Sequence, residues 1–79
     1  MKELLEFIVK KLVADPEKVL ITEIVEDNQV FLHVKVANED YGKVIGKNGK
    51  VAQSLRAIVR ASNTDNSKKY YVKIGEENN

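Results

Sequence analysis

The sequence predicts an α+β domain with the element order α-β-β-α-α-β, a three-stranded mixed sheet and helices on one face of that sheet. Two observations carry this prediction. An amphipathic segment precedes two β-branched runs, and a glycine-rich break divides a second helical stretch before a third alternating run. The 79 residues fit one domain, 1–79, with a polar tail from about residue 75.

The first predicted element is a helix over residues 3–14. Its apolar residues recur at spacings of one, three and four, as on one helix face: Leu4, Leu5, Ile8, Val9, Leu12 and Val13. Asp15-Pro16 ends the pattern, because the residue before proline is pushed out of the α region. Acids and bases interleave with the apolar residues, unlike a signal peptide. We therefore expect no membrane insertion and a cytoplasmic location.

Two strands are predicted next, over residues 19–26 and 30–36. Asp27-Asn28 between them is a turn signal, so the strands should form an antiparallel hairpin. The second run alternates strictly. One side carries Val30, Leu32, Val34 and Val36, and the other carries Phe31, His33 and Lys35.

The second half of the chain predicts two helices and a strand. Asn38 is a candidate N-cap for a short helix over 39–44, and residues 50–62 form a longer one. We expect one face of the longer helix to carry Val51, Leu55, Ile58, Val59 and Ser62. A polar loop, 63–68, leads to a strand over 69–74. A connection of this length suits a right-handed parallel crossover.

Charge is unevenly distributed along the chain. The net charge is only +1, yet residues 41–64 contain no acid and five bases: Lys43, Lys47, Lys50, Arg56 and Arg60. Local potential governs anion binding, so this window is a candidate anion-binding surface, although a solvated helix face would have the same composition. With no cysteine and one histidine, the chain lacks the residues of a thiolate or multi-histidine metal site. We expect no cofactor and no catalytic activity.

Four interpretations compete for the stretch GKVIGKNGK, residues 42–50. Asn48-Gly49 is a strong hairpin signal, but helix formers rather than strand formers follow it. An NTPase phosphate loop needs G-x-x-x-x-G-K-[ST], and here Lys47 is followed by Asn48. The dinucleotide fingerprint needs a strand leading directly into its glycines, which is missing. A tight turn between two helices fits best, and it would expose the N–H groups of the second helix to an anion.

At this point the residues resemble a known family. Val44-Ile45-Gly46-Lys47-Asn48-Gly49 resembles the V-I-G-x-x-G signature of the KH domain, and the element order resembles its type II arrangement. More narrowly, GKVIGKNGKVAQSLRAIVRA resembles the small bacterial single-KH proteins of the KhpA (YlqC) family, and the likeness extends over the whole chain. Many KH domains have isoleucine where this chain has Ala52.

The resemblance implies an RNA-binding site. In KH domains the G-x-x-G loop clamps the backbone of about four nucleotides. Carried onto this chain, the RNA-binding residues would be Val44, Ile45, Gly46, Lys47, Asn48, Gly49, Lys50, Val51 and Arg56. The central strand, 30–36, would form the second wall of the groove. Arg60 could extend the positive path, whereas Tyr70 and Tyr71 are not assigned to RNA.

The resemblance also implies partners. The ligand would be single-stranded RNA, bound weakly, by a homodimer or with a larger KhpB (Jag/EloR)-type KH partner. The implied setting is post-transcriptional regulation, as an RNA chaperone linked to bacterial cell shape, elongation and division. The alternative is a protein-interaction module that acts mainly through its KH-containing partner. Lys47 between two intact glycines favours RNA.

Overall fold

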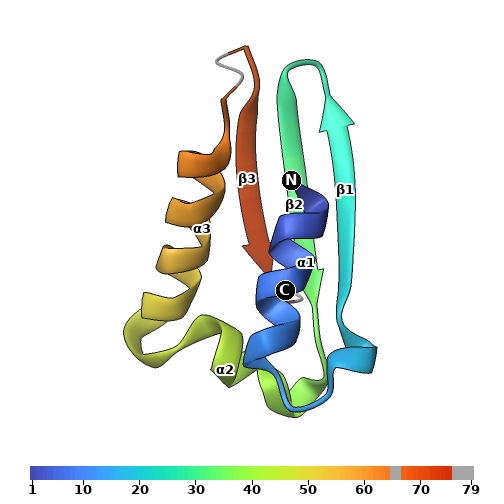
Figure 1. Ribbon diagram of the computed structural model, residues 1–79, viewed down its shortest axis with the longest axis vertical. Helices are drawn as coiled ribbons and strands as arrows, with labels where there is room; N and C mark the ends of the chain where they lie inside the picture. The colour runs from blue at the N-terminus through green and yellow to red at the C-terminus, as the bar shows by residue number, and fades with distance from the viewer. Residues whose placement is uncertain (65–66, 76–79) are drawn as a thin grey trace.

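The computed structural model describes residues 1–64 and 67–75, so part of the predicted 63–68 loop and the predicted tail beyond residue 75 lie outside the described residues. The helices are α1 (Lys2–Leu12), α2 (Tyr41–Ile45) and α3 (Lys50–Ser62), and the strands are β1 (Leu20–Glu26), β2 (Gln29–Lys35) and β3 (Lys69–Ile74). Short 3-10 turns, η1 (Pro16–Lys18), η2 (Asn38–Asp40) and η3 (Lys47–Gly49), lie between them. The predicted order of helices and strands is confirmed (Figure 1).

The strands form a three-stranded sheet in the order β1-β2-β3. β1 and β2 pair antiparallel as a hairpin, with Leu20 opposite Lys35 and Glu26 opposite Gln29. β2 and β3 pair parallel, with Gln29 opposite Lys69. α2 and α3 supply the crossover between the parallel strands, and α3 runs beside β3 in Figure 1. The predicted mixed sheet is therefore correct.

The alternation of β2 determines where the core lies. Val30, Leu32 and Val34 are buried, and they pack with apolar residues of the helices: Leu5, Val9, Val44, Leu55 and Val59. The helices therefore lie on one face of the sheet, while no helix of the described residues lies over the face that carries Phe31, His33 and Lys35. None of the helices within the described residues has the length and apolar character to cross a bilayer.

Two details of the helices differ from the prediction. Asn38 is not the N-cap of α2, because the 3-10 turn η2 comes first and α2 begins at Tyr41. In α3 the buried stripe is Ala52, Leu55 and Val59, whereas Ile58 and Ser62 are exposed. Ala52, Leu55 and Val59 follow one another at spacings of three and four, which places them on one face of the helix.

Candidate nucleic-acid interface

The loop after α2 depends on Gly46. Its backbone has φ +78° and ψ 171°, a conformation that is essentially restricted to glycine. A Cβ added there would lie 2.5 Å from Cγ2 and 2.8 Å from the backbone nitrogen of Val51. The loop therefore packs its backbone directly against the first turn of α3, which holds the two helices at a fixed angle.

The rest of the loop is a tight, exposed turn. Asn48 (φ 57°) and Gly49 (φ 74°) are both left-handed, and the Gly49 N–H donates to the Gly46 carbonyl oxygen at 3.1 Å. A Cβ at Gly49 would meet nothing within 4 Å, so this side of the loop is open to an outside chain. Lys47 and Asn48 project into solvent at its tip. The predicted turn between two helices is confirmed.

Asp40 fixes the start of α2. Its carboxylate is fully buried and accepts hydrogen bonds from the backbone N–H groups of Ala14 (3.2 Å) and Asp15 (3.1 Å). Lys43 Nζ donates to the same carboxylate at 3.2 Å. Burial alone would raise the pKa of Asp40, but these donors and the lysine charge hold that pKa below its ordinary value of 3.8. The carboxylate thus ties the segment after α1 to the helix that leads into the glycine loop.

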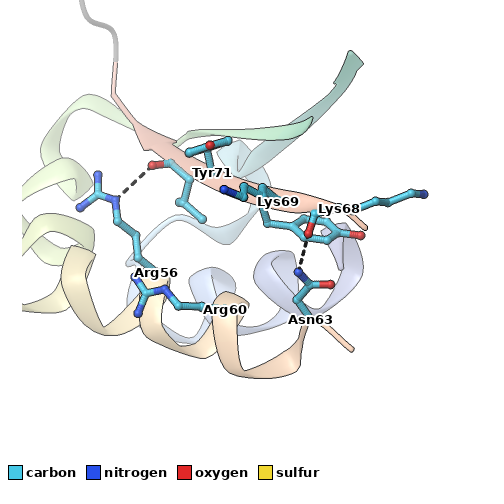
Figure 2. Close-up of a pocket in the computed structure, with 8 residues that line it drawn as sticks. Arg56, Arg60, Asn63, Lys68, Lys69 and Tyr71 are labelled. Carbon is cyan, nitrogen blue, oxygen red and sulfur yellow. Dashed lines mark hydrogen bonds between the residues drawn. The ribbon is translucent and has the colours of Figure 1, made fainter. Parts of the chain in front are cut away.

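A groove of about 420 Å³ runs between α3 and β3 (Figure 2). Four bases, one amide and three residues of β3 line it: Arg56, Arg60, Lys68, Lys69, Asn63, Tyr70, Tyr71 and Val72. No carboxylate is among them, so the groove carries a formal charge of four cations. The combination of cations with two tyrosines is typical of surfaces that bind single-stranded nucleic acid.

The second wall of this groove corrects the sequence prediction. The central strand was expected to form it, but β3 lies beside α3 and no β2 residue lines the groove. The chain passes from α3 to β3 through one short loop, which places these two elements side by side. The inward residues of β2 pack in the core beneath the helices, so β3 alone supplies strand residues to the groove.

Arg56 bridges the two walls. Its Nε donates to the backbone carbonyl of Val72 at 3.2 Å (Figure 2). β3 is an edge strand, and the N–H and C=O groups of one residue in a parallel strand point to the same side. The Val72 N–H therefore also faces α3, and this edge of the sheet presents backbone polar groups to the groove.

The predicted site residues fall into three groups. Lys47, Asn48 and Lys50 are exposed on or beside the loop, and Ile45 is 38% exposed next to it. Val51 is half-buried against the core, and Gly46 and Gly49 form the turn. Arg56 lies in the α3–β3 groove, about 9 Å along the helix axis from Lys50 at 1.5 Å per residue.

Val44 is a correction to the predicted site. It is fully buried within the core, so its side chain cannot form the wall of an open groove. Sequence reasoning also left out the β3 side of the groove, Lys68 to Val72. The signal was available in the run KKYYV, where two bases and two aromatics adjoin a polar loop. Within residues 1–64 and 67–75, no group of three His, Cys, Asp or Glu side chains is arranged to hold a metal ion.

Comparison with known proteins extends these observations. The family model described as "KhpA/KhpB, KH domain" matches residues 2–74. A protein named "RNA-binding protein KhpA" from Oceanobacillus iheyensis is 46% identical over 74 residues, which cover 94% of this chain and 99% of that protein. Proteins of the same name from Clostridium perfringens (45%, with 94% and 99% covered) and Treponema pallidum (37%, with 92% and 91% covered) are also similar. No solved structure gives a significant match.

Proposed function

Because the chain belongs to the KhpA/KhpB KH-domain family, we propose that it binds single-stranded RNA, with the Gly46–Gly49 loop as the backbone clamp. The relatives are named as RNA-binding proteins. The observation that carries the proposal is the loop itself. Gly46 has no room for a Cβ, Gly49 is open to an outside chain, and Lys47 lies between them.

The clamp is proposed to work through backbone groups and charge together. The Lys50 N–H donates to the Lys47 carbonyl oxygen of the preceding 3-10 turn, and the next N–H groups of α3 lie at its positive dipole end with no partner within the helix. A phosphate that approaches over Gly49 meets no side chain and lies between Lys47 and Lys50. A loop of this kind contacts the backbone of about four nucleotides in KH domains, which makes binding tolerant of base sequence.

The bases are proposed to enter the α3–β3 groove. Tyr70 offers apolar surface there, and the outward N–H of Val72 offers a donor to a base edge. Arg56 occupies the Val72 carbonyl with one N–H and has further donors available in its guanidinium group. Arg60 and Lys69 would neutralise phosphates along the rim.

A single small module binds RNA weakly, so we propose that this one acts as a pair. Two linked sites raise the overall affinity without any new contact. The partner is a second copy or a larger KhpB-type KH protein, and the setting is cytoplasmic post-transcriptional regulation.

The clamp is tested by fluorescence anisotropy with a short single-stranded RNA. Lys47→Asp/Asn48→Asp should weaken binding at least tenfold, since both changes put negative charge where a phosphate would lie. Lys18→Asp/Asn38→Asp is the matched control, because it makes the same two chemical changes at exposed positions of η1 and η2. Circular dichroism checks that both variants remain folded. If both variants bind as wild type does, the loop is not the clamp and the protein-interaction role takes precedence.

A further inference from the structure

The face of the sheet opposite the helices has an ordered pattern of its own. The strand register places Ile24, Phe31 and Tyr71 in one row across this face, and Thr22, His33 and Lys73 in the next. Within residues 1–64 and 67–75 no helix covers these rows, since the helices there pack on the face of Val30, Leu32 and Val34. Of this face, the RNA-binding proposal above uses only Lys69, at the rim of the groove.

An aromatic pair lies at the centre of it. The rings of Phe31 and Tyr71 stack with their centroids 5.2 Å apart and their planes 19° apart. Tyr71 is 43% exposed, and Ile24 beside the pair is 48% exposed. Aromatic pairs between neighbouring strands stabilise sheets, and that role accounts for the contact between the rings. It does not account for the exposure of Tyr71, which leaves aromatic surface facing water beside the half-buried Phe31.

The charges around the pair have one predominant sign. The strand residues of this face include Lys35, Lys69 and Lys73, all exposed, against one carboxylate, Glu26. His33 lies between the aromatic row and Lys35, and its Nε2 donates to the Gly75 carbonyl oxygen at 2.7 Å. An exposed aromatic ring flanked by lysines is complementary to single-stranded nucleic acid, where each phosphate is followed by a base that stacks.

We propose that this face, centred on Phe31 and Tyr71, is a second RNA-binding surface on which bases stack. A second copy of this chain fits it less well, because two such faces would bring six lysines together against two carboxylates. RNA is a polyanion, so its phosphates would neutralise these lysines instead of adding to their repulsion. The inference rests on the proposed function, since the same RNA strand would leave the groove and continue onto the sheet.

The two surfaces are continuous at β3. Tyr71 and Lys69 are among the residues that line the α3–β3 groove, and they also belong to the open face. In Figure 2 Tyr71 lies on the side of the β3 ribbon away from Arg60. An RNA strand that passes the edge of β3 therefore moves from the groove to the aromatic pair over Lys69 and Tyr71, which belong to both surfaces. RNA longer than the clamp alone can hold should contact both surfaces.

The test compares two single-stranded RNAs, one of about four nucleotides, which fills the clamp, and one of about ten. Phe31→Leu and Lys35→Gln/Lys73→Gln alter the open face at residues that do not line the groove. We expect Phe31→Leu to weaken binding of the longer RNA about tenfold and the double lysine variant about threefold, with the shorter RNA unaffected. Phe7→Leu, at a 61% exposed aromatic on α1, is the matched control and should change neither.

Each further outcome is decisive. If the variants bind both RNAs as wild type does, the sheet inference is wrong and the clamp proposal stands. If Lys47→Asp/Asn48→Asp leaves binding intact while Phe31→Leu weakens it, the clamp proposal fails and the sheet surface stands. If wild type binds neither RNA, the clamp proposal and the sheet inference both fail.

If the open-face variants change the sedimentation coefficient but not RNA affinity, the occupant is a second copy and the inference is overturned. Circular dichroism and urea unfolding exclude loss of fold.

Discussion

At the scale of single residues, Gly42 and Gly46 differ in whether the fold requires a glycine. We predict that Gly46→Ala destabilises the fold by about 2 kcal/mol or more, because φ is +78° and the new methyl group would overlap Val51. Gly42→Ala should instead stabilise it by about 0.5–1 kcal/mol, since Gly42 lies within α2 and a Cβ there meets nothing within 4 Å. Urea unfolding measures both. Equal midpoints for the two variants would contradict the role assigned to Gly46.

Asp40 gives a prediction about pH. Its pKa is lowered on folding, so its contribution to stability is present above pH 3.8 and is lost as the pH falls from 3.8 through the folded-state value. Asp40→Asn should be less stable than wild type at pH 7, because an amide has one acceptor oxygen and would turn its NH₂ toward a backbone N–H of Ala14 or Asp15.

The measurement for Asp40 is urea unfolding at pH 7 and pH 3. The difference in unfolding free energy between wild type and Asp40→Asn should narrow at the lower pH, because Asp40 of the unfolded wild-type chain binds a proton there more readily than Asp40 of the folded chain. Glu39→Gln, at an exposed neighbouring acid, is the control and should leave stability at pH 7 nearly unchanged. If the difference in unfolding free energy is the same at both pH values, the charge of Asp40 does not contribute to stability.

The residue scale also marks what the sequence could predict. The spacing of Gly46 and Gly49 predicted the turn, since few backbones other than a left-handed one require two glycines there. The sequence could not show which of Val44 and Ile45 is buried and which is exposed. Neighbouring residues in a helix point in different directions, and α2 is too short for a periodic stripe. The role of Asp40 was beyond sequence reasoning, since its partners lie 25 and 26 positions away.

At the scale of elements, the groove depends on how α3 is attached to the edge strand β3. We predict that Arg56→Gln lowers stability by about 1 kcal/mol, since it removes the hydrogen bond to the Val72 carbonyl, and that it also weakens RNA binding. Arg60→Gln, one turn later on the same helix, should weaken RNA binding without a comparable loss of stability. The Arg60 side chain makes no hydrogen bond within the described residues. Urea unfolding and anisotropy on the two variants separate these effects.

Element order was predictable because each helix and strand has its own period, and glycine, proline and Asp-Asn mark the breaks. Which strand lies beside α3 could not be predicted from the sequence. Periodicity shows that residues 69–74 form a strand, but the wall of the groove depends on which strand lies nearest the helix in space. The aromatic pair on the open face could not be predicted for the same reason. Phe31 and Tyr71 are 40 positions apart and come into contact only through the parallel register of their strands.

At the scale of the whole molecule, the arrangement of charge matters more than its sum. The chain has a net charge of +1, yet the groove residues carry four cations and no carboxylate. The fold produces this separation by bringing Arg56 and Arg60 of α3 opposite Lys68 and Lys69, while acids such as Glu23 lie on the distant strand β1. A near-neutral protein can therefore present a strongly positive path to RNA.

The dependence of RNA binding on salt tests this arrangement. For single strands, log K falls with log[salt] at about 0.7 per neutralised phosphate, so about three contacts in a short RNA give a slope near −2. Arg60→Gln should reduce the magnitude of that slope by about 0.7, because one phosphate contact is lost. Lys10→Gln leaves the groove intact while changing net charge equally, since Lys10 pairs with Glu6 on α1. It should not alter the slope. If both variants reduce the slope alike, binding responds to total charge and the groove does not define the path.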